Sequence, residues 1–205
     1  MNPVDLKPCI IEDADGWKTL STERRFTSDY VQIDEVLVRT PSQPDRDLSW
    51  TVVKRKSAVA VAPMTEDGRF VMVQQERVAP RRAFLEFPAG QIDDVANRLE
   101  PEVILATVES ELREEVGYRL APGAKVTPMG YYFTSQGYSD EHIYLFAVSP
   151  VVPEERGNDP DASESILGAR LVEPSELKAM IASGDACDSL TLALFARLTA
   201  LGILG

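Results

Sequence analysis

Short runs of apolar and β-branched residues divide the first quarter of the chain into expected strands. Trp17–Leu20, Tyr30–Ile33 and Val36–Arg39 are each rich in such residues and are separated by polar turns. Thr40–Asp47 holds two prolines and three charged residues, which predicts a loop. We therefore expect residues 1–52 to form a small antiparallel β-sheet region of their own.

A second pair of apolar runs follows in the sequence. Ser57–Pro63 is a run of small, mostly apolar residues, as expected for a strand buried on both faces. Phe70–Gln74 resumes after the turn Glu66–Arg69, whose Asp-Gly pair is a strong hairpin signal. The two strands are therefore predicted to pair as an antiparallel hairpin.

Residues 101–116 carry the clearest helical pattern. Apolar side chains recur at positions 104, 105, 108, 112 and 116, which lie on one face of a helix. Pro101 suits the first helical position, where its missing N–H costs nothing. Gly117 suits the position just past the helix end. The pattern thus predicts an amphipathic helix with one buried face.

The second half of the chain mixes strands and helices. Strands are expected at Val126–Tyr132 and His142–Val148, and helices at Glu176–Ser183 and Leu190–Leu201. Pro153–Ser165 predicts a long polar loop, and such loops are often functional. Because strands and helices do not alternate strictly, we expect an α/β protein of the mixed α+β kind, with a mixed sheet flanked by helices in residues 53–205.

Charge and composition narrow the range of partners. Thirty-three acidic against 21 basic residues give a formal net charge of −12, which disfavours nucleic-acid polymers as partners. Cys9 and Cys187 form no metal-binding pattern. No apolar stretch approaches the ~20 residues that cross a membrane, and the N-terminus lacks a signal-peptide pattern. The expected location is the cytoplasm.

Three glutamates near the end of the expected helix are the strongest chemical feature. Glu111, Glu114 and Glu115 share one arc of the helix, at the edge of its apolar stripe. Such closely spaced like charges repel unless a cation joins them, and clustered carboxylates suit Mg²⁺ or Mn²⁺. The triplet by itself also fits a solvated acidic helix face, with Arg113 pairing with Glu109.

The surroundings of these glutamates resemble the Nudix box, with the pattern G-x5-E-x7-R-E-U-x-E-E-x-G-U, where U is aliphatic. Glu102 and the run Glu111–Tyr118 match this pattern in register. Three further segments are similar to the ADP-ribose pyrophosphatase branch of the family: Glu86-Phe-Pro-Ala-Gly90, Thr134–Glu141 and Gln75-Glu-Arg77. The resemblance covers most of the chain and implies a Nudix α/β/α sandwich.

The resemblance also implies a reaction. Divalent cations held by the box would bridge a diphosphate, and a water activated by the metal would attack phosphorus. The best single substrate is ADP-ribose, cleaved to AMP and ribose 5-phosphate, in a homodimer that forms through residues 1–52. The implied metal ligands are Glu111, Glu114, Glu115 and the carbonyl of Ala89.

The remaining implied site residues serve catalysis or substrate binding. Glu114 and Glu115 are counted with Glu164 as the catalytic carboxylates. Glu164 is preferred over Asp161 and Glu155 of the same acidic loop as the general base. The implied substrate-binding residues are Arg77, Glu86, Gly137, Trp17 and Trp50.

Three departures from the family pattern bear on function. Ser110 stands where the pattern has an arginine that normally orients a catalytic carboxylate. Asp93–Arg98 is an insertion within the box, and Gln136 replaces the proline of the Ser-Pro-Gly marker. These departures leave two alternatives, which are cleavage of a UDP- or GDP-sugar and a catalytically impaired Nudix protein that binds or senses nucleotides.

Overall fold

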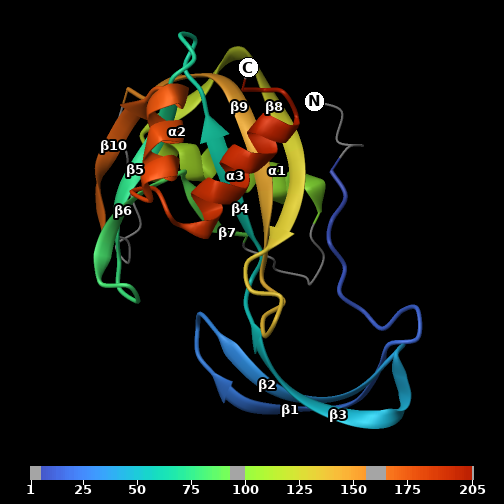
Figure 1. Cartoon of the computed structure of the whole chain (residues 1–205). Helices are drawn as coiled ribbons and strands as arrows, with labels where there is room; N and C mark the ends of the chain where they lie inside the picture. Colours follow the sequence, from blue (N-terminus) through green and yellow to red (C-terminus); the bar gives the residue numbers. More distant parts are fainter. Residues whose placement is uncertain (1–5, 93–99, 156–164, 205) are drawn as a thin grey trace.

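The computed structural model describes residues 6–92, 100–155 and 165–204 of the chain, which form three sheets and three helices (Figure 1). The strands are β1 (Lys18–Thr27), β2 (Gln32–Thr40), β3 (Gln43–Lys54), β4 (Ala58–Pro63), β5 (Phe70–Arg77), β6 (Arg82–Glu86), β7 (Ala89–Gln91), β8 (Tyr118–Phe133), β9 (His142–Pro153) and β10 (Ile166–Val172). The helices are α1 (Pro101–Glu114), α2 (Pro174–Ser183) and α3 (Ser189–Ala200).

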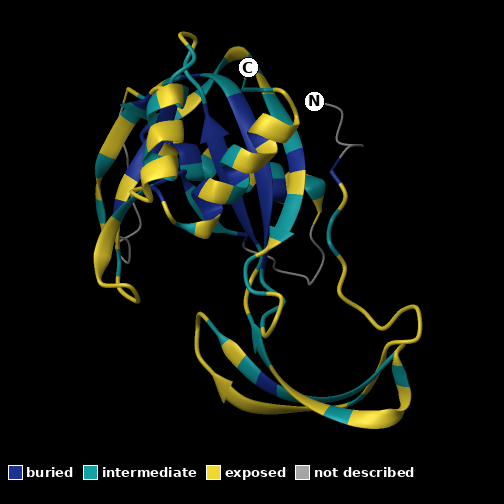
Figure 2. Cartoon of the chain, in the orientation of Figure 1, coloured by how far each residue is buried: buried dark blue, intermediate teal, exposed yellow. Residues whose placement is uncertain are grey.

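The first sheet, with the order β1-β2-β3, projects away from the rest of the molecule as a long curved ribbon (Figure 1). Both of its strand pairs are antiparallel, which confirms the predicted N-terminal sheet. Most of its residues are exposed or only half-buried (Figure 2). This sheet therefore contributes little to the buried core of the molecule.

The loop predicted at Thr40–Asp47 is wrong in its second half, because β3 already begins at Gln43. Strand β3 lies at the edge of its sheet, where a proline is tolerated because its missing N–H can face solvent. The register also shifts between the pairs Val38↔Leu48 and Thr40↔Gln43, so Pro44 falls within an irregular stretch. Pro44 is therefore compatible with a strand at this position, whereas Pro41 lies in the turn between β2 and β3.

The main body is a sandwich built around β4. This strand is buried at every residue, as predicted, and lies inside a mixed sheet of order β7-β4-β9-β8, parallel to β9 and antiparallel to β7. Ala60 and Ala62 face the core under α2 and α3, whereas Val59 and Val61 face the core under α1. Helices thus cover both faces (Figure 1), which confirms the mixed α+β sandwich.

The predicted hairpin between the fourth and fifth strands is wrong. Strand β5 belongs to a separate sheet with the order β10-β5-β6. The expected turn exists, since Thr65 N–H donates to Arg69 O at 2.9 Å, but only an isolated bridge, Met64↔Phe70, joins the two strands. Each strand already has two neighbours, so its backbone hydrogen bonds are satisfied elsewhere and the two strands diverge.

Helix α1 packs against the sheet through the predicted stripe. Ile104, Val108 and Leu112 are fully buried, and each contributes about 1.5–3 kcal/mol relative to an exposed side chain. The helix ends at Glu114, two residues earlier than expected, and Gly117 follows with a φ of 67°. Helix α1 therefore carries its glutamates at a well-anchored C-terminal end.

No helix in the described part of the chain is both long and apolar enough to cross a membrane.

Candidate functional site

The connection between β6 and β7 forms one wall of the candidate site. Phe87 is fully buried and packs edge-on against Phe70, with ring centroids 5.1 Å apart. Val61 N–H donates to Pro88 O at 2.9 Å, which ties the connection to the central strand. Ala89 and Gly90 follow at once in β7 and are therefore held by the core opposite the end of α1.

Glu111 lies directly over Gly90. A Cβ atom built at Gly90 would overlap the carboxylate of Glu111. The backbone of Gly90 is not left-handed, so conformational freedom does not explain the glycine. Glycine is needed here because it leaves the space that the carboxylate fills, a close approach that any side chain would block.

Glu115 approaches the same wall from the next turn of the chain. It is only 1% exposed, and its Oε2 accepts a hydrogen bond of 2.8 Å from Ala89 N–H. A buried carboxylate is costly unless it is paired, so this contact fixes both the side chain and the β7 backbone. The structure thus brings Glu111 and Glu115 together at Ala89–Gly90.

Glu114 contacts residues of its own helix. Its Oε1 accepts a hydrogen bond of 2.6 Å from the hydroxyl of Ser110, one turn earlier in α1. Arg113 lies beside both groups, with Nη2 3.5 Å from that Oε1. In these contacts Arg113 lies beside Glu114, whereas the sequence predicted Glu109 as its partner on a solvated helix face. The three glutamates therefore have different partners: Glu111 and Glu115 lie against Ala89–Gly90, whereas Glu114 contacts Ser110 and Arg113.

Arg77 and Glu86 form an ion pair at the ends of β5 and β6. Arg77 Nη2 lies 2.5 Å from Glu86 Oε2, and Glu86 is buried. Burial lowers the pKa of Arg77, but the hydrogen bonds to Glu86 and the charges of Glu86, Glu115 and Asp188 raise this pKa above its usual value. The guanidinium therefore stays charged within the field of the site's acids.

The donor chemistry at Ala89–Gly90 fits a divalent cation. Glu111 and Glu115 supply hard carboxylate oxygens, which Mg²⁺ and Mn²⁺ prefer, and the space at Gly90 lets the first carboxylate approach the backbone. Within the described ranges, no group of three or more His, Cys, Asp or Glu side chains is already arranged to hold a metal ion. A complete coordination shell would therefore need main-chain oxygen or water as well.

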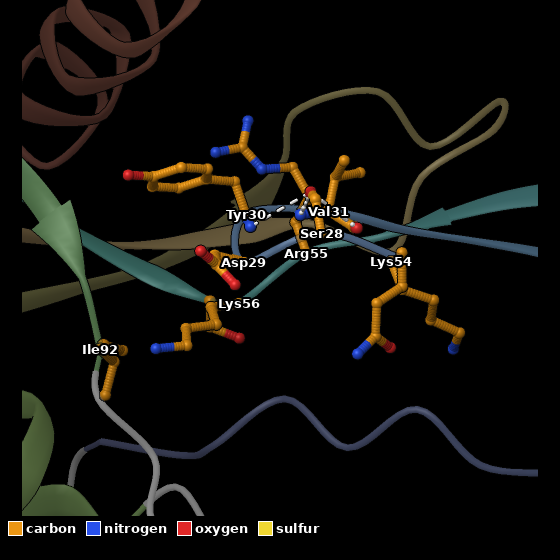
Figure 3. A pocket seen from close by; sticks show the side chains of 10 residues that line it. Ser28, Asp29, Tyr30, Val31, Lys54, Arg55, Lys56 and Ile92 are labelled. Atoms are coloured by element: carbon orange, nitrogen blue, oxygen red, sulfur yellow. Dashed lines mark hydrogen bonds between the residues drawn. The ribbon is translucent and has the colours of Figure 1, made fainter. Parts of the chain in front are cut away.

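A basic pocket of about 390 Å³ adjoins the other end of β7 (Figure 3). Ile92, two residues beyond Gly90, forms one wall, and Tyr30, Arg55 and Lys56 are among the other lining residues (Figure 3). Lys54, on the same lining segment, pairs with Asp140 at 2.7 Å. The pocket joins the turn between β1 and β2 to the strand that carries Ala89 and Gly90.

Three of the predicted substrate-binding residues, Trp17, Trp50 and Gly137, lie where the first sheet meets the connection between β8 and β9. Trp50 Nε1 donates to the carbonyl of Gly137 at 3.2 Å. Trp17 is 54% exposed and lines a groove of about 820 Å³ together with Phe133 and Gln136. The structure thus joins Trp50 to Gly137 and places Trp17 near the same connection.

Two predicted features lie outside the described residues. They are the general base Glu164, together with its alternative Asp161, and the insertion Asp93–Arg98. Glu155, the remaining alternative, lies in a turn after β9. Sequence reasoning also missed Arg113 as a partner of Glu114. The spacing of Ser110, Arg113 and Glu114, which puts the first residue three and four positions from the others, was the signal that could have found it.

Comparisons with known proteins show the family of the chain. Residues 54–191 match the model of the NUDIX domain. The chain is 30% identical over 162 residues to an ADP-ribose pyrophosphatase of Bacillus subtilis (strain 168), covering 78% of this chain and 82% of that protein. It is 29% identical over 151 residues to a methanol dehydrogenase activator of Bacillus methanolicus, covering 73% and 75% respectively.

A solved structure is similar in fold. The crystal structure of an ADP compounds hydrolase matches with a TM-score of 0.70 and covers 95% of this chain and 100% of that chain. Sequence identity between the two is 16%, so this likeness supports the fold alone. The fold match includes nearly the whole chain, and therefore also the N-terminal region that the domain model does not cover.

Proposed function

The chain belongs to the Nudix family and is a pyrophosphatase of that family, and on this premise we propose that it cleaves the diphosphate bond of a nucleoside diphosphate sugar. The observation that carries the proposal is the convergence of Glu111 and Glu115 on Ala89–Gly90 within the matched domain. That convergence puts hard oxygen donors on a rigid wall, as binding of a cation and a diphosphate requires.

The metal in this proposal is Mg²⁺ or Mn²⁺. The ion would be held by Glu111, Glu115 and the carbonyl of Ala89, with Glu114 beside them. When bound, the cation offsets the charge of the diphosphate and lowers the pKa of a water that attacks phosphorus. The hydrogen bond from Ala89 N–H holds Glu115 in place before any ligand arrives, so binding costs little rearrangement of that side chain.

Arg77 would contact a phosphate oxygen of the substrate. Its charge is secured by Glu86, which is buried and receives two hydrogen bonds from Arg77 Nε and Nη2 to Oε2, at 3.0 and 2.5 Å. A guanidinium held on one side by a fixed carboxylate can direct its remaining N–H groups at an anion. In a chain of net charge −12, this local positive charge and the cation together make diphosphate binding feasible.

ADP-ribose is the substrate that we propose first, with AMP and ribose 5-phosphate as products. The similarity to the ADP-ribose pyrophosphatase of Bacillus subtilis supports this choice. Trp17, Trp50 and Gly137 would border the nucleoside end, since they gather where the first sheet meets the β8–β9 connection. A UDP- or GDP-sugar is the alternative, because Gln136 departs from the family marker and lines the same groove as Trp17.

Residues 1–52 would form a dimerisation region, and residues 53–205 the Nudix hydrolase domain. The support is the exposed aromatic surface of this region, where Trp17, Phe26 and Trp50 are each more than half exposed. Both cysteines are free, which agrees with a reducing compartment, and the cytoplasm stays the location that we propose.

Product release from a panel of substrates tests the function. Purified protein is incubated with ADP-ribose, a UDP-sugar and a GDP-sugar in Mg²⁺, Mn²⁺ or EDTA, and nucleoside monophosphate release is measured. We expect metal-dependent AMP release from ADP-ribose, with kcat reduced about 100-fold in Glu115→Gln, a change that preserves an acceptor for Ala89 N–H.

Two other outcomes would change the proposal. Preferential cleavage of a UDP- or GDP-sugar would replace the substrate but keep the reaction. Silence across the panel, together with tight binding of a nucleotide, would support the impaired nucleotide-binding alternative that Ser110 raises.

A further inference from the structure

Ser110 uses its hydroxyl in an unusual way for a helical residue. Serine and threonine inside helices commonly donate to the carbonyl four residues earlier. Thr107 does so to Val103 O at 2.9 Å, and Thr199 to Phe195 O at 2.8 Å. Ser110 instead donates forward to Glu114 Oε1 at 2.6 Å. Its hydrogen bond is therefore directed at a carboxylate beside the candidate metal site.

Arg113 completes this arrangement. Its Nη2 donates to Ser110 Oγ at 3.2 Å and lies 3.5 Å from Glu114 Oε1. The hydroxyl therefore accepts from the arginine and donates to the glutamate, which uses both of its functions at once. Arg113 is also the basic residue in the last turn of α1, where the other charged side chains are glutamates. The contact thus joins a positive charge to Glu114 through the serine.

Two arginines contribute positive charge near the glutamates. The charge of Glu115 acts on Arg77, across the site in β5. Glu114 is contacted by Arg113, from its own helix. Glu111, Glu114 and Glu115 lie within five residues, and without compensation their charges would repel one another and drive the side chains apart. Arg113 therefore offsets the repulsion at the solvent side of this cluster.

We propose that Arg113 is a positioning residue, which acts with Ser110 to hold the Glu114 carboxylate in place for cation binding. This inference rests on the proposed function only in assuming that the glutamates hold a divalent cation. Serine alone supplies one hydrogen bond and no charge, so the arginine one turn away supplies the positive charge. The chain thereby has a substitute for the arginine that the Nudix pattern puts at position 110.

Mn²⁺ binding to the metal-free protein, measured by calorimetry, tests the role without requiring turnover. We expect Arg113→Ala to weaken Mn²⁺ binding about tenfold, as loss of a residue supporting a metal ligand commonly does. It should lower kcat for ADP-ribose more than it raises KM, and Arg113→Lys should recover part of the loss. Arg170→Ala is the matched control, because Arg170 and Glu176 form an ion pair of nearly equal exposure, 52% and 39% against 53% and 38%.

A second variant tests whether an arginine at the family position can replace Arg113. Ser110→Arg in the Arg113→Ala background moves the guanidinium to the family position, and we expect Mn²⁺ affinity and kcat to return to within about twofold of wild type, given that exposed pairs add little beyond positioning. The control Arg170→Ala should leave both unchanged.

Two results would overturn the inference. One is an Arg113→Ala variant whose Mn²⁺ affinity stays within about twofold of wild type, which would make the pair an ordinary surface contact. The other is a wild-type protein that binds no Mn²⁺. A wild-type protein that binds Mn²⁺ but leaves ADP-ribose intact would count against the proposed substrate only, and the Mn²⁺ affinities would still decide the role of Arg113.

Discussion

At the scale of single residues, one glycine sets the position of a carboxylate. Gly90 was identified from the family pattern, but its physical role is visible only in the structure, where the Glu111 carboxylate occupies the space of a Cβ. Many glycines are retained for backbone conformation, and this one is explained by close approach instead. The two causes predict different effects of the same substitution.

Gly90→Ala should therefore impair activity and spare the fold. The added methyl displaces the end of a flexible side chain, so the free energy of unfolding should change little, whereas displacement of a catalytic group by about 1 Å can cost about 100-fold in rate. Urea unfolding and steady-state kinetics on one preparation check both effects. Unchanged kcat would show that Glu111 works from another position.

At the scale of elements, the sequence predicted each helix well and the pairing of strands less well. The stripe of Ile104, Val108 and Leu112 depends on helical periodicity, a local property, and it is buried as expected. Which strand pairs with which depends on contacts distant in sequence. The turn after β4 was predicted, but β4 and β5 entered different sheets because each has two other neighbours.

The N-terminus of α3 offers an element-scale prediction. Asp188 caps the helix, since its Oδ1 accepts from Thr191 N–H at 2.7 Å, while its buried Oδ2 has no hydrogen-bond partner. Burial raises the pKa of Asp188, against the lowering effect of its contacts with Thr191. The folded chain therefore holds the proton of this carboxyl more tightly than the unfolded chain does.

Asp188→Asn should be more stable than wild type at pH 7, because it keeps a capping oxygen and removes the buried charge. The sign follows from the raised pKa: the native carboxyl is favoured when protonated, so the advantage of asparagine should vanish as the pH falls below the ordinary value of 3.8. Urea unfolding at neutral and acidic pH measures this. Asp188→Ala, which loses the cap, should cost about 1 kcal/mol.

An asparagine variant that is less stable than wild type at pH 7, with the difference disappearing at acidic pH, would contradict this account. It would show that the negative charge at the start of α3 stabilises the helix more than its burial costs.

At the scale of the whole molecule, the first sheet is the element that the core does not explain. It projects from the sandwich (Figure 1) and is largely exposed (Figure 2). A three-stranded sheet with both faces in solvent buries little apolar surface, so a second copy of the chain is the partner that we propose for it.

Light scattering after size exclusion should therefore give twice the chain mass of 22.6 kDa. Phe26→Glu, in the exposed surface of the first sheet, should shift the protein toward monomer, since burying an unpaired charge opposes association. Val78→Glu is the control, because Val78 is 74% exposed and lies outside that sheet. A wild-type protein that stays monomeric at high concentration would remove the proposal.

The sequence by itself determined the features that rest on local pattern. These are the helices, the fully buried strand β4, the small N-terminal sheet, and the spacing of the glutamates that resembles the Nudix box. Periodicity and motif spacing act over a few residues, so they can be interpreted without knowledge of the rest of the chain.

Only the tertiary structure decided the strand pairing and the direction of each carboxylate. Glu111 and Glu115 reach Ala89 and Gly90, more than 20 residues earlier in the sequence, whereas Glu114 pairs with Ser110 and Arg113. Helical spacing places all three glutamates on one side of α1, but it contains no information about which partner lies opposite. The buried β6–β7 connection supplies those partners, because packing in the core fixes it against the end of α1.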